Sequence, residues 1–276
     1  MSTQVAPPLE KPRRAARRKP PSAALYEVVV PLIATAAAFL VWEAICQAFK
    51  VPSYLVPPPS AIWNDTIAIG PTVFWHSLAT LKTVLLGFVF SIAISLPLAV
   101  LLTASPAIAS AIYPFLVWTQ SVPKVALAPI LVVVLGSNEL PRIVITVLVA
   151  FFPLVISSAT GLMSVPPELI ELSRACRASK WSELWRIRLP YAIPFIFAGL
   201  KVAISLAVVG AVVAEFVNAD AGLGFLIVTS TAFFKVPVAF GALIILSIMG
   251  VVLFQIVVIA ERVFFPWSSG NAPVAS

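Results

Sequence analysis

Charged residues are scarce in this sequence, and the scarcity limits the class of protein that it encodes. Only 11% of the 276 residues are charged and 61% are hydrophobic, whereas soluble domains carry about 25% charged residues. A soluble chain this apolar would need a core larger than its length can enclose. The composition therefore excludes a soluble single-domain enzyme and a disordered chain, and it predicts an all-α integral membrane protein.

Cysteine and histidine are also scarce. Cys46 and Cys176 are too few for a disulfide framework, and Cys176 has no neighbour at metal-ligand spacing. The single histidine, His76, has no Gly-x-Ser-x-Gly partner, which argues against an intramembrane hydrolase. No phosphate-cradling Gly-x-x-x-x-Gly-Lys-Ser/Thr stretch occurs. We therefore expect no metal, no cofactor and no ATP hydrolysis by this chain.

The positive charge that is present is confined to two segments. The net charge is +7, and residues 1–20 hold six basic residues and one acidic residue, while 166–190 hold five basic and three acidic ones. The remaining residues carry no net charge. This distribution is typical of the positive-inside rule and argues against nucleic-acid binding.

Long apolar runs indicate the membrane spans. A helix rises about 1.5 Å per residue, so it needs roughly 20 apolar residues to cross the hydrocarbon layer. Six runs meet this length, and they cover residues 26–49, 75–104, 108–135, 142–163, 190–217 and 236–264. Prolines at 114, 123 and 129 interrupt the third run, and a proline-rich stretch at 51–60 is expected to be a stiff connector.

Six crossings place both termini on one side, and the basic N-terminus predicts that this side is cytoplasmic. The polar stretch 164–189 then also lies in the cytoplasm. We expect a basic, proline-rich tail at 1–24, a transmembrane domain at 25–267 with a cytoplasmic loop at 164–189, and a C-terminal tail at 268–276.

The loop 164–189 predicts two short helices. Pro166, Pro167 and Glu168 suit the first turn of one helix, and Ser179 is a good cap for the second. Apolar residues at helical spacing predict a side of each helix that can pack: Leu169, Leu172, Ala175 and Cys176 on the first, and Trp181, Leu184 and Trp185 on the second. Such a surface suits either the lipid headgroup region or a soluble partner.

This loop resembles the cytoplasmic "EAA" loop of permease subunits of ATP-binding cassette importers. Glu171 stands at the family's Glu position, Leu172 and Ser173 at the two Ala positions, and Arg177 at the Gly position. Further matches are the Ala178-Ser179-Lys180-Trp181 stretch and the Ile187-Arg188-Leu189-Pro190 ending. By this resemblance, the residues that couple to the ATPase are Glu171, Ser173, Arg174, Arg177, Ala178, Ser179, Trp181, Leu189 and Pro190.

Arg177 departs from the family pattern. Glycine allows a left-handed turn at this position, which arginine adopts at a cost of about 1–2 kcal/mol. Two alternatives remain open from the sequence: the break between the short helices differs here, or the helix continues through Arg177.

The wider resemblance, over residues 39–267, is to the nitrate/sulfonate/taurine branch of these permeases. It rests on Val41-Trp42-Glu43, Gln120 to Pro129, Val213 to Phe216, Gly222 to Phe225, Glu261-Arg262 and Pro266-Trp267. The resemblance implies a type I importer permease fold in the bacterial inner membrane. It also implies two ATPase subunits, a periplasmic or lipid-anchored substrate-binding protein, a second permease copy and surrounding membrane lipid.

Ionisable residues inside spans cost about 2.5–3.5 kcal/mol each and are functional candidates. Lys82, Glu43 and Lys201 lie near enough to span ends to reach the headgroups. The candidates for the translocation pathway are Gln120, Lys124, Glu215 and Asn218, although a structural ion pair or cap suits Lys124 and Glu215 equally well.

An embedded lysine favours an anionic solute such as a sulfonate, taurine or nitrate. Relatives of this branch also carry neutral heterocycles, such as pyrimidine or vitamin precursors. A secondary transporter is the alternative from another class, but no clear inverted repeat is present and it leaves 164–189 unexplained.

Overall fold

The computed structural model describes residues 21–268. It divides into two units, Met1–Val51 and Pro52–Ser276, and within the described range every regular element is a helix. The predicted tails at 1–24 and 268–276 fall outside this range, apart from 21–24, which begin the first helix, and Ser268.

The first unit contains one helix, α1 (Pro21–Ala48). Its segment Val29–Ala48 is long and apolar enough to span a membrane, in agreement with the predicted run at 26–49. The proline at position 31 lies inside this helix.

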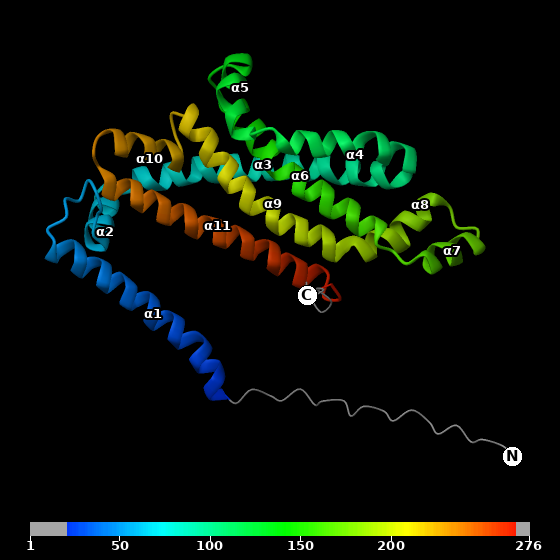
Figure 1. Ribbon diagram of the computed structural model, residues 1–276, viewed down its shortest axis with the longest axis horizontal. Coiled ribbons are helices and arrows are strands. Elements are labelled where there is room, and N and C mark those ends of the chain that lie inside the picture. Colours follow the sequence, from blue (N-terminus) through cyan, green and yellow to red (C-terminus); the bar gives the residue numbers. More distant parts are fainter. Residues whose placement is uncertain (1–20, 269–276) are drawn as a thin grey trace. The chain divides into compact units, whose positions relative to one another are not determined.

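Three long helices form the core of the second unit (Figure 1): α3 (Pro71–Ala104), α6 (Glu139–Met163) and α9 (Leu189–Val217). Small residues let them approach closely, because a Cβ at Gly87 of α3 would overlap Thr146 of α6. Helix α11 (Val236–Phe264) packs against the same core through Leu253 and Val257.

The third predicted span is sharply bent. It consists of α4 (Pro106–Ser121), the 3-10 turn η1 (Lys124–Leu127) and α5 (Ala128–Leu135), with an 80° angle across the break. Proline at position 123 lacks the N–H that would continue α4, so the helix ends before it.

The bent segment still returns the chain to the opposite end of the bundle. Lys82 of α3 pairs with Glu139 at the start of α6, and Leu102 near the end of α3 packs with Leu162 near the end of α6. The two helices therefore run in the same direction. Among the described residues, five helices qualify as membrane spans and the bent pair provides a sixth candidate.

Two short helices occupy stretches that the sequence analysis treated as connections. Helix α2 (Pro59–Ala68) begins at the end of the proline-rich stretch 51–60 and packs on α11, where Thr66 fills the space beside Gly241. Helix α10 (Leu223–Ala232) packs on α11 through Leu223 and Leu226.

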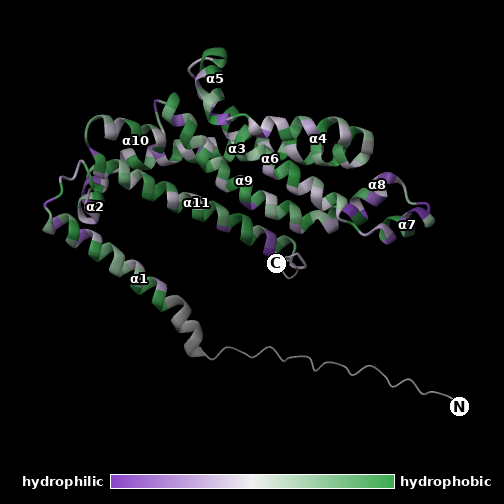
Figure 2. Cartoon of the chain, in the orientation of Figure 1, coloured by the Kyte–Doolittle hydropathy of each residue, from purple (hydrophilic) through white to green (hydrophobic). Residues whose placement is uncertain are grey.

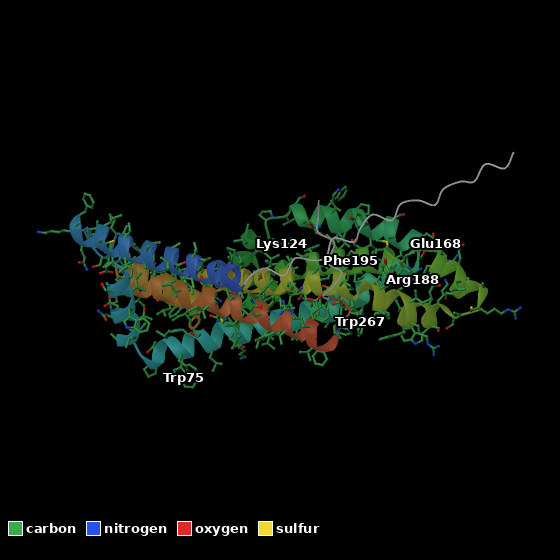
Figure 3. All side chains as sticks on the ribbon, turned by 90° about the horizontal axis from the view of Figure 1, so that it is seen from below. Trp75, Lys124, Glu168, Arg188, Phe195 and Trp267 are labelled. Atoms are coloured by element: carbon green, nitrogen blue, oxygen red, sulfur yellow. The ribbon has the colours of Figure 1, made fainter. Side chains whose placement is uncertain are left out.

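The loop 164–189 contains α7 (Pro167–Ala175), α8 (Lys180–Glu183) and the π-helical turn η2 (Leu184–Arg188). Hydrophilic residues gather on α7 and α8, in contrast to the apolar α9 and α11 (Figure 2). Because this loop joins the end of α6 to the start of α9, it lies about 37 Å from the start of α6, the length of a 25-residue helix. Trp75 lies toward one end of the second unit, and Glu168 and Arg188 lie toward the other (Figure 3).

Candidate functional site

The backbone of loop 164–189 reverses direction at Arg177. The Arg177 N–H donates to the Arg174 carbonyl at 2.9 Å, and the Ala178 N–H donates to the Ser173 carbonyl at 3.0 Å. These two bonds form a Schellman motif, in which the residue after the cap is left-handed. Arg177 has φ +54°, so α7 ends as it would with glycine and does not continue through Arg177.

The next helix begins at once. Ser179 is extended, and its Oγ accepts a hydrogen bond from the Ser182 N–H at 3.2 Å, which caps α8 as the sequence predicts. Ser173 is buried, and its Oγ has no hydrogen-bond partner. Ser173 therefore packs inward, at the position where the family has a small alanine.

Arg188 ties this loop to the bundle. Its Nε donates to Glu183 Oε1 at 2.7 Å, and its Nη1 donates to the Leu162 carbonyl at the end of α6 at 3.3 Å. Leu184 packs against the cluster that contains Leu162 and Ala192. The roles of Glu183 and Arg188 were not predicted from the sequence. Their spacing of five residues, which matches one π-helical turn, is the signal that relates them.

The predicted apolar side of α7 does not pack on the helix bundle. Leu169 and Leu172 are exposed, Leu172 to 60%, because the inward position is taken by Ser173. On the second short segment Leu184 packs inward, while Trp181 is 68% exposed and touches Trp185 edge to face with ring centroids 5.5 Å apart. Charged residues surround these apolar groups, and the exposed ones are Glu168, Glu171, Arg174, Arg177, Lys180 and Arg186.

Loop 164–189 presents its large side chains outward. The side chains that hold the loop are buried or half-buried, whereas large apolar side chains with a charged rim face outward. A contiguous exposed apolar patch with a polar rim is typical of a protein interaction site.

At the other end of the bundle, side chains cap the first turn of α10. The Gly222 N–H donates to His76 Nδ1 at 3.0 Å, the Leu223 N–H to Thr80 Oγ1 at 2.7 Å, and the Gly224 N–H to Glu215 Oε2 at 2.8 Å. Thr80 also donates to Glu215 Oε2 at 3.0 Å. Glu215 is only 2% exposed, and the geometry makes it a helix cap.

The loop before α10 leaves no space for larger residues. Gly222 has φ +126°, and a Cβ there would overlap the Glu215 carboxyl group. Arg142 of α6 holds the same loop, since its Nη1 donates to the Ala221 carbonyl at 3.2 Å and its Nη2 lies 3.8 Å from Asp220 Oδ1.

The remaining candidate pathway residues do not form one hydrogen-bonded group in the part of the chain that the structure describes. The Lys124 Nζ lies 4.4 Å from the centroid of the Phe152 ring, a cation–π contact. Gln120 is exposed on α4, and Asn218 lines a cavity. Lys201 pairs with Glu261 at 2.5 Å, so its ammonium group is engaged inside the bundle.

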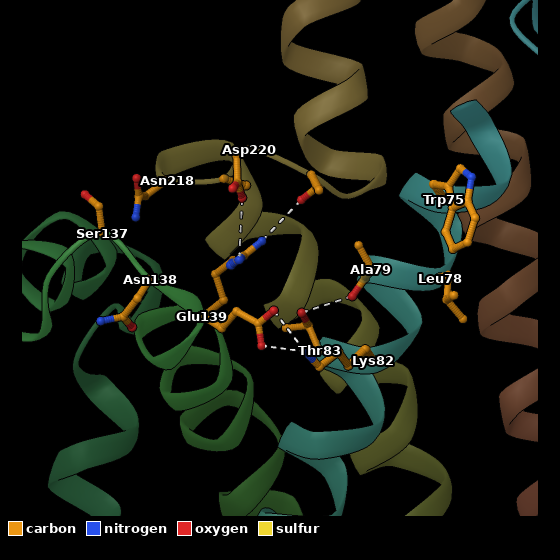
Figure 4. A pocket seen from close by; sticks show the side chains of 13 residues that line it. Trp75, Leu78, Ala79, Lys82, Thr83, Ser137, Asn138, Glu139, Asn218 and Asp220 are labelled. Atoms are coloured by element: carbon orange, nitrogen blue, oxygen red, sulfur yellow. Dashed lines mark hydrogen bonds and ion pairs between the residues drawn. The ribbon is translucent and has the colours of Figure 1, made fainter. Parts of the chain in front are cut away.

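The cavity has a volume of about 850 Å³ and lies between α3, α6 and the loop before α10 (Figure 4). Lys82 of α3 crosses it and donates to both Glu139 oxygens, at 2.7 and 2.9 Å. Arg142 and Asp220 also line this space. We call the end of the bundle with this cavity the cavity end.

Known proteins resemble most of this chain. Residues 91–269 match the family model described as "Binding-protein-dependent transport system inner membrane component". The formylaminopyrimidine transport permease protein ThiX of Halalkalibacterium halodurans is 32% identical over 88% of this chain and 97% of its own.

Two further relatives are similar over most of their length. The riboflavin transport system permease protein RibX of Chloroflexus aurantiacus is 31% identical over 83% of this chain and 86% of its own. The putative aliphatic sulfonates transport permease protein SsuC of Bacillus subtilis is 26% identical over 97% of this chain and 98% of its own.

A solved structure shares the fold. A chain of the MetNI methionine ABC transporter, in an inward-facing conformation, matches with a TM-score of 0.61 at 21% sequence identity. The match covers 67% of this chain and 93% of the MetNI chain.

Proposed function

Because this chain belongs to the family of binding-protein-dependent transport system inner membrane components, we propose that loop 164–189 couples it to the ATPase subunits of its importer. The chain is the permease subunit of an ATP-binding cassette importer and a multi-pass protein of the bacterial inner membrane.

The exposed apolar surface of loop 164–189 carries this proposal. Leu172 and Trp181 face outward on a backbone that is fixed by the Schellman motif, by the Ser179 cap and by Arg188. A rigid loop at the junction of α6 and α9 transmits the displacement of a bound partner to both helices. Coupling of this kind needs a binding surface and an element with two arrangements, here the helix bundle.

The membrane orientation supports the same proposal. The basic residues of 1–20 and of loop 164–189 belong on the cytoplasmic side, where ATP is available. The substrate-binding protein then contacts the opposite face, and apolar side chains such as Val133, which is 85% exposed, face lipid or a second permease copy. Two copies of this chain would enclose the pathway, with one ATPase on each loop.

The first candidate substrate is a small solute with an anionic group, such as a sulfonate, nitrate or the zwitterionic sulfonate taurine. Relatives of this chain include permeases named for aliphatic sulfonates and for bicarbonate, and Lys124 supplies a positive charge inside the bent span.

The second candidate substrate is a neutral heterocycle. Relatives at 32% and 31% identity are named for formylaminopyrimidine and riboflavin. Lys124 is engaged with the Phe152 ring, so an anion has to compete with an existing contact.

The coupling surface is tested by replacing Trp181. We expect Trp181→Ala to weaken co-purification of the ATPase about tenfold or more, because large aromatic side chains dominate such interfaces. Ser173→Ala is the matched control: the resemblance includes Ser173 among the coupling residues, but its hydroxyl is buried, so this change leaves the exposed surface intact. Undiminished ATPase binding and transport by Trp181→Ala, Glu171→Ala and a charge reversal of Arg174 would contradict the proposal.

A further inference from the structure

The cavity lies at the end of the bundle away from loop 164–189, and its lining residues indicate which class of solute it binds. We infer that it binds an uncharged polar ring compound during transport, in preference to an anion. This inference rests on the proposed importer function and specifies the class of solute that the permease accepts.

One wall of the cavity is aromatic and apolar. One face of α3 carries the residues at positions i, i+3, i+4 and i+7, which are Trp75, Leu78, Ala79 and Lys82. The Trp75 ring is 64% exposed, and Figure 4 shows it at one side of the cavity with Leu78. This wall offers a flat surface for a planar ring.

The opposite wall of the cavity carries polar side chains without charge. Ser137 and Asn138 come from the turn before α6, and Asn218 follows the end of α9. The Asn138 side chain caps α6, since its Oδ1 accepts from the Leu140 N–H and its Nδ2 donates to the Leu135 carbonyl. Ser137 and Asn218 therefore supply the remaining polar side chains of this wall. Hydroxyl and amide groups both donate and accept hydrogen bonds, as the edge of a polar ring requires. The volume of about 850 Å³ lies within the usual range for small-molecule sites, about 300–1,000 Å³.

The charged groups of the lining cancel one another. Lys82 is held by both oxygens of Glu139, and Arg142 lies between Asp220 and the Ala221 carbonyl. A small anion would meet two carboxylates as well as two cations. A zwitterion would have to break the bidentate Lys82–Glu139 pair, so an uncharged solute fits this lining best.

An alternative role for Trp75 is to anchor the chain at the lipid headgroups, where exposed tryptophans are common. Trp63 of α2 is 69% exposed and does not line the cavity. It is therefore a matched control, because an anchoring role predicts the same effect for both tryptophans.

The test uses the permease with its ATPase subunits in lipid nanodiscs and measures binding of radiolabelled uracil. Methanesulfonate and taurine serve as anionic and zwitterionic competitors of similar size. We expect saturable uracil binding that neither competitor displaces. Trp75→Ala should weaken it about fivefold, Trp75→Phe should stay within about twofold, and Trp63→Ala should have no effect.

A second variant tests the charge balance. Glu139→Gln leaves Lys82 without its carboxylate, so methanesulfonate binding should improve about threefold while uracil binding is unchanged. The inference is overturned by absent uracil binding, by displacement with methanesulfonate or taurine, by equal effects of Trp75→Ala and Trp63→Ala, or by unchanged methanesulfonate binding in Glu139→Gln. These outcomes are independent of the Trp181→Ala result, which tests the coupling surface alone.

Discussion

The two ends of the helix bundle close their loops in different ways. Loop 164–189 is closed mainly by its own backbone, through the left-handed Arg177 and the Ser179 cap. The loop before α10 is closed by side chains from other helices: Thr80 of α3, Arg142 of α6 and Glu215 of α9.

This difference relates to what each end presents to its surroundings. Because local hydrogen bonds shape most of loop 164–189, its large apolar and charged side chains remain outside and available to a partner. At the cavity end the polar side chains point inward and hold the start of α10. The proposed coupling surface lies at one end, and the other end is held as a wall by side chains from three helices.

The largest expected effect is at Gly222. Gly222→Ala places a Cβ at φ +126° against the Glu215 carboxyl group, and we expect a loss of about 3 kcal/mol or more in stability. The apparent thermal midpoint in detergent measures it. Gly250→Ala is the control, since no atom lies within 4 Å of a Cβ there, and it should be neutral or slightly stabilising. Equal midpoints for the two variants would show that the wall is not rigid.

The second-largest effect on stability is expected at Glu215. Glu215→Ala leaves the Gly224 N–H and the Thr80 hydroxyl without an acceptor in a buried place, which costs about 2–3 kcal/mol. Glu215→Gln keeps an acceptor oxygen, so its loss of stability should be about half that of Glu215→Ala. Hydrogen exchange at the Leu223 and Gly224 amides should accelerate most in the alanine variant. Loss of transport without faster exchange would instead assign Glu215 to the pathway.

The smallest effect is expected at Arg177. Arg177→Gly relieves the left-handed strain and should stabilise the loop by about 1 kcal/mol. Amide exchange at Ala178 should slow, whereas Arg174→Gly, inside α7, should accelerate it. If exchange at Ala178 is unchanged in Arg177→Gly, the turn does not depend on the local conformation at this position.

Much of the fold was predictable because the residues that end a membrane span lie next to that end in the sequence. The sixth run at 236–264 coincides with α11, and the second ends at Ala104, where the prediction placed it. The cap at Ser179 was also predictable, since N-caps depend on residues within one turn. The family followed from motifs of the same local kind.

Other features have no local signal. Helices α2 and α10 are short and lie in stretches rich in turn residues, so their helical state depends on packing against α11. The outward position of Leu172 was not predictable, because helical spacing identifies an apolar side without showing what covers it. The roles of Arg188 and Glu183 were missed for the same reason.

The sequence by itself determined that this chain crosses a membrane, roughly where its long apolar runs lie, and which family it belongs to, because apolar run length and short motifs are local properties. Tertiary structure alone decided the contacts of Glu215 and Arg142 and the neutral lining of the cavity. Each of these depends on residues far apart in the chain, such as Thr80 and Glu215, which become neighbours only when α3 packs against α9.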